Sequence, residues 1–254
     1  MTNESKKENI ELILGDYKKA IRKLSWPIVV SLLISVSYNF IDCMWVAKLG
    51  SNELAAMGLI LPLYFVFVAF GSGLATGVNS LIARYIGARN FKNASNSAVH
   101  GIFLTIIASI LLAIVMNLSL PYILALMHAG SATTAALEYG NIIFNGAFVL
   151  FYSNVGIAIL RSEGDVKRGM YLMTATTILN IILDPIFIFN FNMGIGGAAW
   201  ATIITETINC IVLIYWIISK RTHTLMFHLE TLNITQILQK RFYLLQYQIH
   251  QKIY

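Results

Sequence analysis

The stretch Asn180-Ile-Ile-Leu-Asp184-Pro185 places a carboxylate and a proline inside an otherwise apolar run, Met170 to Phe191. Hydrocarbon does not solvate a charge, so an ionisable residue in such a run needs a partner, a proton or a cation, and it indicates a functional site. Pro185 has no N–H, so the carbonyl oxygen of Ile181 loses its helical partner and can face a cavity. Asn180 lies one helical turn before Asp184 on the same face, so amide, carbonyl and carboxylate oxygens can converge.

The composition predicts that this run belongs to a membrane protein. Of the 254 residues, 57% are hydrophobic and only 12% are charged, and the mean hydropathy is +0.69. A water-soluble domain could not hide so much apolar surface. The net charge of +6 would also suit nucleic acid, but the basic residues fall between apolar runs, so we expect no nucleic-acid partner. Cys43 and Cys210 have no Cys or His neighbour at metal-ligand spacing, and we expect both to be buried.

Six apolar runs are long enough to cross a bilayer, which takes about 20 helical residues. They are Leu24 to Ala47, Met57 to Ala83, Ala98 to Met127, Ala135 to Leu160, Met170 to Phe191 and Gly196 to Ser219. The predicted fold class is therefore an all-α membrane protein, with a bundle of six transmembrane helices in residues 24–219. Residues 1–23 are predicted to form a cytoplasmic arm, and residues 220–254 a cytoplasmic tail without a further span.

Basic residues alternate from one connection to the next. The N-terminal arm, the second and fourth connections and the start of the tail carry Lys6, Lys7, Lys18, Lys19, Arg22 and Lys23, then Arg84, Arg89 and Lys92, then Arg161, Lys167 and Arg168, then Lys220 and Arg221. The first connection has only Lys48, and the third and fifth have none. Lys and Arg concentrate on the cytoplasmic side of membrane proteins. The alternation predicts a multi-pass protein of the cell membrane with both termini in the cytoplasm.

Three acidic residues, Asp42, Asp184 and Glu206, fall inside the predicted spans, and no Lys, Arg or His lies deep in a span to pair with them. At 1.5 Å per residue, Asp42, Asp184 and Thr202 lie roughly 8 to 10 Å below the outer surface, although three different helices carry them. Asn180 and Glu206 lie about one turn deeper. The sequence therefore predicts that oxygen ligands from separate helices meet in one layer.

These side chains predict an oxygen-rich pocket for Na⁺, H⁺ or both, with Asp42 and Asp184 as the groups that bind the ion or the proton. Tyr38 lies one turn from Asp42 on the same helix face and joins Asn180 and Thr202 in the set. Carboxylate, amide and hydroxyl oxygens suit a hard cation, whereas imidazole or thiolate would indicate a transition metal. Neighbouring carboxylates also favour protonation of one another. The alternative is that each acid only hydrogen-bonds a neighbouring helix.

Small residues gather in two segments, Gly71 to Gly77 and Gly194 to Ala201. The first contains a GxxxG pair, Gly73 and Gly77. Small residues let membrane helices approach closely, so we expect both segments to lie at helix contacts. The first segment is not a nucleotide-binding loop, because no strand precedes it and no lysine follows it.

Several segments resemble the N-terminal lobe of the multidrug and toxic compound extrusion (MATE) family of transporters. They are Tyr38-Asn-Phe-Ile-Asp42-Cys-Met-Trp-Val-Ala-Lys-Leu-Gly50, Leu54-Ala-Ala-Met-Gly58, Arg84-Tyr-Ile-Gly-Ala-Arg89, Leu160-Arg-Ser-Glu-Gly-Asp165, Asn180-Ile-Ile-Leu-Asp184-Pro185 and Gly194-Ile-Gly-Gly-Ala-Ala-Trp-Ala-Thr202. The resemblance extends over roughly Leu24 to Lys220, in order and at the expected spacing.

The resemblance implies a function. The family exports bulky, often cationic organic compounds in exchange for Na⁺ or H⁺, with no cofactor, and its fold is two lobes of six helices each. In prokaryotic members the N-terminal lobe carries the cation site. The matching positions here are Tyr38, Asp42, Asn180, Asp184 and Thr202.

Four further residues are candidates for other roles. Pro27 is expected by resemblance to act as a hinge in the first helix, and the alternative is a proline tolerated in the first turns. Tyr139 and Asn154 are expected by the same resemblance to face the substrate, and Glu206 is a candidate for the same role.

The chain departs from the family in length, because it offers six spans where the family has about twelve. The segment after Lys240 does not resemble the second lobe, so we expect a truncated or frame-shifted product that ends in a shortened linker. The missing lobe would then be a partner of this chain, or two copies could pair in parallel.

Two other functions compete with cation-coupled export. A non-transporting membrane fragment or scaffold would not bind Na⁺. An intramembrane aspartyl protease also needs two aspartates on separate helices, but such enzymes carry Gly-x-Gly-Asp, whereas Asp184 follows Ile-Ile-Leu. We therefore expect that the protein is not an enzyme.

Overall fold

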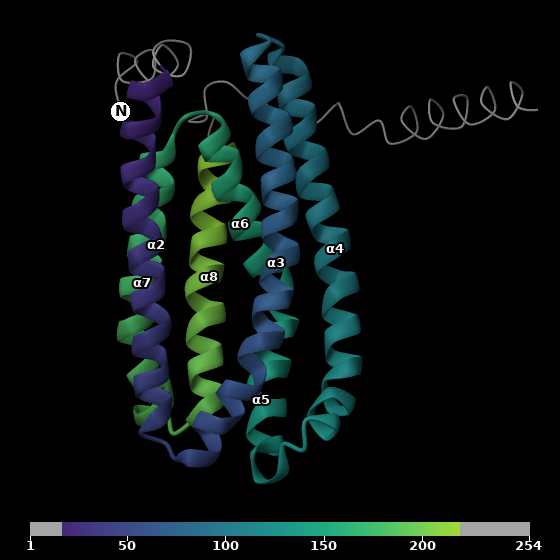
Figure 1. The fold of residues 1–254 in the computed structure, drawn as a ribbon, viewed down its shortest axis with the longest axis vertical. Helices are drawn as coiled ribbons and strands as arrows, with labels where there is room; N and C mark the ends of the chain where they lie inside the picture. The colour runs from purple at the N-terminus through teal and green to yellow at the C-terminus, as the bar shows by residue number, and fades with distance from the viewer. Residues whose placement is uncertain (1–16, 219–254) are drawn as a thin grey trace, which may run out of the picture.

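The structure is a computed structural model that describes residues 17–218, and every element within that range is helical. In chain order the elements are α2 (Tyr17–Ala47), α3 (Ser51–Gly87), α4 (Phe91–Leu126), η1 (Gly130–Ala132), α5 (Thr133–Asn145), α6 (Ala147–Ser162), α7 (Val166–Pro185), η2 (Ile186–Asn190) and α8 (Gly194–Ile218). Figure 1 shows them as one elongated bundle of roughly parallel helices. Most of the predicted arm and all of the predicted tail lie outside the described residues, and α2 already includes Tyr17 to Lys23 of the predicted arm.

The structure confirms the predicted all-helical membrane architecture. By length and composition, four stretches of the described chain can each cross a membrane: Ser51–Gly87, Phe91–Leu126, Val166–Asn190 and Gly194–Ile217. The pair α5 and α6 makes a fifth if it is counted as one span. The remaining predicted span, Leu24 to Ala47, lies within α2, whose 31 residues extend over about 46 Å.

The fourth predicted span is broken, not straight. It consists of α5 and α6, whose axes differ by 48° at Gly146. A Cβ atom at Gly146 would collide with the side chain of Ile203 on α8. Glycine therefore lets α8 pass close to the bend. Hydropathy could not reveal this break, because apolar residues continue on both sides of it.

The two ends of the bundle differ in charge. The start of α2, the α3–α4 connection, the α6–α7 connection and the end of α8 lie at the upper end in Figure 1, whereas the α2–α3, α4–α5 and α7–α8 connections lie at the lower end. The clusters Arg84 to Lys92 and Arg161 to Arg168 therefore both fall at the upper end. The cytoplasmic location of that end remains a prediction from the distribution of Lys and Arg.

The helices pack so that α2 lies against α7, and α8 contacts α5, α6 and α7. On the other side, α3 packs against α4 and α6. The largest core cluster includes Phe67, whose ring centroid lies 5.2 Å from that of Phe144 and 4.9 Å from that of Phe151. This arrangement places α2, α7 and α8, which carry the predicted ion ligands, next to one another.

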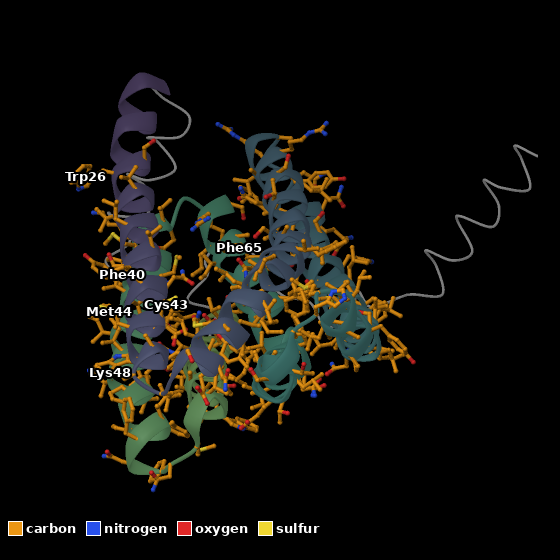
Figure 2. All side chains as sticks on the ribbon, turned by 60° about the horizontal axis from the view of Figure 1, so that its bottom comes forward. Trp26, Phe40, Cys43, Met44, Lys48 and Phe65 are labelled. Atoms are coloured by element: carbon orange, nitrogen blue, oxygen red, sulfur yellow. The ribbon has the colours of Figure 1, made fainter. Side chains whose placement is uncertain are left out.

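Large apolar side chains also cover the outside of the bundle. Figure 2 shows Trp26, Phe40 and Met44 on α2 and Phe65 on α3, and all four side chains are more than half exposed. Such a surface would be unfavourable in water, whereas lipid chains or another apolar surface can cover it.

The two glycine-containing segments behave differently. A Cβ atom on Gly197 would lie 2.7 Å from the backbone carbon of Phe187, so α8 touches the backbone of η2 there. By contrast, a Cβ atom on Gly73 or Gly77 would meet nothing within 4 Å. The prediction of a close helix contact at the GxxxG pair is therefore wrong for the described residues. In that part of α3, Gly71 is the residue that packs closely, against the ring of Phe151.

Candidate functional site

The sequence around Asp184 places this residue at the end of α7. Pro185 closes the α-helix, and the five residues of η2 continue as a π-helix. Short π-helical segments occur frequently at functional sites, because they change the direction of the side chains around them. Gly197 then allows α8 to pack against η2, which places Thr202, five residues later, beside the end of α7.

A hydrogen-bonded set joins α7 to α8. Asn180, Asp184 and Thr202 are all buried, with 2%, 0% and 6% of their surface exposed. With the Asn180 amide oriented so that donors face acceptors, its nitrogen donates to Asp184 Oδ2 at 3.0 Å, and its oxygen accepts from the backbone N–H of Thr202 at 3.3 Å. The structure thus brings together three of the five predicted ion ligands.

Asp42 lies on α2 and faces a small cavity. Its side chain is 3% exposed, and its Oδ1 atom has no hydrogen-bond partner among the described residues. The cavity, whose volume is about 10 Å³, is also lined by Asn39, Tyr64, Tyr139 and Thr202. A cavity of this size holds about one water molecule. A buried carboxylate oxygen therefore borders a space that fits a single water or a small dehydrated ion.

The other predicted residues are two ligands, Asp184 and Tyr38, and the hinge candidate Pro27. Asp184 does not line the small cavity, although its helix, α7, packs against α2, which carries Asp42. Tyr38 and Pro27 belong to α2, and their side chains lie outside the described residues.

A second, larger cavity adjoins the first and has a volume of about 180 Å³. Glu206 and Asn209 on α8 and Asn154 on α6 line it, together with apolar residues. Glu206 Oε2 accepts a hydrogen bond from Asn209 Nδ2 at 3.2 Å, whereas Asn209 Oδ1 is buried and has no partner among residues 17–218. Two of the three candidate substrate residues thus share one cavity. Tyr139 lines the small cavity instead.

The predicted set of ion ligands did not include Tyr64 and Asn39, which line both cavities. Asn39 lies with Tyr38 about one turn from Asp42 on the same helix face, and that position was a usable signal. Tyr64 gave no such signal, because tyrosine is common in membrane helices and its helix, α3, carries none of the acids. Only the packing of α3 shows that its side chain faces Asp42.

The chemistry of this region is that of oxygen ligands. Across residues 17–218, no three His, Cys, Asp or Glu side chains gather as a metal centre. Carboxylate, amide and hydroxyl oxygens from α2, α7 and α8 are present instead, and they suit a proton or a hard monovalent cation. In the part of the chain that the structure describes, no Lys, Arg or His lines either cavity.

Comparisons with known proteins place the chain among transporters. A family model described as MatE matches residues 27–186. The probable multidrug resistance protein YoeA of Bacillus subtilis is 28% identical over 207 residues, which is 79% of this chain and 44% of that protein. The FAD transporter of Shewanella oneidensis is 26% identical over 202 residues, covering 78% and 45%. A crystal structure of MATE in complex with MaD3S has a TM-score of 0.84 and 38% identity, covering 88% of this chain and 50% of that one.

These matches cover most of this chain but less than half of each curated relative. The chain spans about half the length of the curated relatives that it matches. The match to the family model runs from α2 to the first residue of η2, so it includes both Asp42 and Asp184. On the evidence of the family model and of the shared fold, this chain belongs to the MATE family.

Proposed function

We propose that this chain is the cation-binding lobe of an exporter that moves organic, often cationic compounds out of the cell in exchange for Na⁺ or H⁺. The observation that carries the proposal is that Asp42 lines a cavity of about 10 Å³ and that its buried Oδ1 atom has no hydrogen-bond partner among the described residues. A buried charge without a partner is strongly unfavourable, so this oxygen needs a proton or a cation. Among the described residues no basic side chain lines the cavity, so the proposal takes the partner to be a proton or a cation from solution.

The neighbouring residues support an ion site at this place. Asp184 supplies a second carboxylate, and Asn180 and Thr202 supply an amide and a hydroxyl oxygen. Hard cations favour such a mixture of oxygen ligands. Tyr38, the fifth candidate, is proposed for the same set on the resemblance alone.

The second cavity is the proposed place for part of the exported compound. Val68, Leu150, Ile157 and Met173 give it apolar walls, and Glu206 places one carboxylate among them. Binding sites for organic molecules combine apolar walls with a few polar groups in this way. Glu206 would attract a positive group, and Asn154 lies in the same wall. Tyr139 lines the small cavity, which favours a role beside the ion.

A complete transporter would need a second bundle, since the relatives are about twice as long as this chain. We propose that a second lobe, or a second parallel copy of this chain, covers the cavities, with Pro27 as a hinge in α2. Cross-linking in membranes separates these partners: covalent dimers of the chain support a second copy, and strictly monomeric chains oppose it.

The ion site predicts a change in stability with Na⁺. If Na⁺ binds only the folded chain, a concentration of 100 times Kd stabilises it by about 2.7 kcal/mol. Replacing choline chloride with NaCl at equal ionic strength should therefore raise the Tm of the purified chain, and Asp42→Asn should remove the increase. If the proton is the coupling ion, the folded chain should instead lose stability as the pH rises, and the same variant should flatten that slope.

The control for this experiment is Glu138→Gln, which neutralises an exposed carboxylate outside both cavities. It should respond to Na⁺ and pH as the unsubstituted chain does. If the unsubstituted chain and Asp42→Asn respond identically to both ions, the proposal is wrong. A fragment or scaffold that does not transport anything would then be the better description.

A further inference from the structure

A third cavity is lined by residues of α3, α6 and α7, toward the end of the bundle that carries the basic clusters. Its volume is about 140 Å³, and Thr76 and Asn79 on α3 and Arg161 on α6 contribute polar groups to its wall. The third cavity shares Asn154, Ile157 and Met173 with the second cavity, in which Glu206 lies. The two cavities are therefore neighbours, with a carboxylate in one and a guanidinium in the other.

Within residues 17–218, Arg161 lacks the anionic partner that an arginine normally has. Among the described residues its side chain donates only to the sulfur of Met173, at 3.8 Å, and thioether sulfur is a weak acceptor. Nearby, Arg168 forms an ion pair with Asp165 at 3.1 Å, whereas Arg161 forms none with any residue that the structure describes. The side chain is only partly exposed, so water does not fully replace an anion. The guanidinium thus has several N–H donors available toward the cavity.

The surroundings of Arg161 suit a carboxylate or a phosphate group. A guanidinium binds such groups with two parallel hydrogen bonds. The amide of Asn79 lies in the same wall and adds a possible donor. Along α6, Arg161 comes seven residues after Asn154, about 10 Å away, so one organic molecule can reach both cavities.

We propose that the third cavity is an anion subsite, where Arg161 binds a carboxylate or phosphate group of the exported compound. The preferred compounds then carry a positive group toward Glu206 and a negative group toward Arg161, on either side of an apolar body. This inference rests on the proposed function, because it assumes that the second cavity receives the compound.

The test compares two dyes with nearly the same body. Rhodamine B carries a cationic ring system and a carboxylate at neutral pH, whereas its ethyl ester carries only the cation. Fluorescence anisotropy measures the binding of each dye to the 254-residue chain in nanodiscs of phosphatidylcholine, with empty nanodiscs as the background. A hydrogen bond to a charged group predicts that rhodamine B binds about tenfold more tightly than the ester.

Substitutions at Arg161 assign this preference to one side chain. Arg161→Gln should weaken the binding of rhodamine B about tenfold and leave the binding of the ester unchanged. Arg161→Lys should keep part of the preference, because lysine retains the charge but not the two parallel hydrogen bonds. Arg84→Gln is the matched control, since it removes a basic side chain from the same end of the bundle but outside the three cavities.

Each outcome has a distinct meaning. Equal affinity of the unsubstituted chain for the two dyes overturns the anion subsite and leaves the proposed function intact, and this comparison needs no variant to fold. Absence of binding of both dyes contradicts the compound-binding part of the proposed function, and the subsite with it. A preference that disappears when the nanodiscs contain phosphatidylglycerol shows that a lipid headgroup occupies the subsite, which overturns the assignment to the exported compound.

Discussion

Asp42 and Asp184 are the same residue type at the same predicted depth, but their carboxylates are satisfied differently. Asp184 Oδ2 accepts a hydrogen bond from Asn180, whereas Asp42 Oδ1 is buried without a partner in the described chain. An unsatisfied buried polar group costs about 1 to 3 kcal/mol, and a charged one costs more. An arriving ion or proton can recover that free energy. The less satisfied carboxylate is therefore the better candidate for the first contact with the ion.

The aromatic core around Phe67 predicts a large loss of stability when this single side chain is truncated. Phe67 is fully buried between Phe144 and Phe151, so Phe67→Ala leaves a cavity among rings that cannot close it. Truncation of a buried phenylalanine typically costs about 3 to 5 kcal/mol. Unfolding of the purified chain in mixed micelles by increasing fractions of a denaturing detergent measures the loss.

Phe65 provides the matched control, because it is the same residue type on the same helix but is 58% exposed (Figure 2). Phe65→Ala should change the free energy of unfolding by at most about 0.5 kcal/mol. Equal losses in the two variants would show that the Phe67 cluster does not stabilise the bundle.

At the scale of elements, the contact between α8 and η2 determines how the ion ligands meet. Gly197 brings the two backbones together, and Thr202 follows on the same helix. Pro185 ends α7 at the level of Asp184, so the chain can turn into η2 and return as α8. Helix ends and backbone contacts position the site, and the acids depend on them for their mutual placement.

This contact predicts opposite results for two glycine substitutions. Gly197→Ala forces a methyl group to within 2.7 Å of backbone atoms that have little freedom to move, and such overpacking costs about 1 to 3 kcal/mol. Gly73→Ala places a methyl group in open space, where the helix propensity of alanine should stabilise α3 by up to about 1 kcal/mol. The same detergent-unfolding measurement gives both values. A loss at Gly73 as large as that at Gly197 would contradict the packing described here.

At the scale of the whole molecule, the basic residues and the helix directions agree. Connections rich in Lys and Arg lie at one end of the bundle, and connections with few or none lie at the other (Figure 1). The positive-inside rule then predicts that the basic end faces the cytoplasm. In this orientation the Asp42 cavity lies toward the outer leaflet, and Arg161 lies near the cytoplasmic face.

Labelling with a membrane-impermeant maleimide tests the orientation. In a Cys43→Ser and Cys210→Ser background, Ser131→Cys should react in intact cells, because Ser131 is exposed at the end poor in basic residues. Lys92→Cys, which is exposed at the opposite end, should react only after the membrane is permeabilised. Labelling of Lys92→Cys alone in intact cells would reverse the topology and place the Asp42 cavity near the cytoplasm.

Much of the fold could be predicted from the sequence, because hydropathy and charge are local properties. The apolar runs coincide with helices, and the depth of Asp42, Asp184 and Thr202 followed from counting residues along each run. The break at Gly146 and the open space beside Gly73 were not predictable, since both depend on which helix passes nearby. The position of Tyr64 beside the acids was missed for the same reason.

The sequence by itself determined that this protein is a helical membrane bundle with acids at one depth, because a bilayer requires apolar spans of a minimum length and makes buried charge unfavourable. Tertiary structure alone decided that Asp42 faces a cavity, that Asp184 is held by Asn180, and that Glu206 and Arg161 lie in adjoining cavities. The positions of these side chains depend on how each helix is rotated and on which helix it packs against. Both depend on packing between residues that are far apart in the chain.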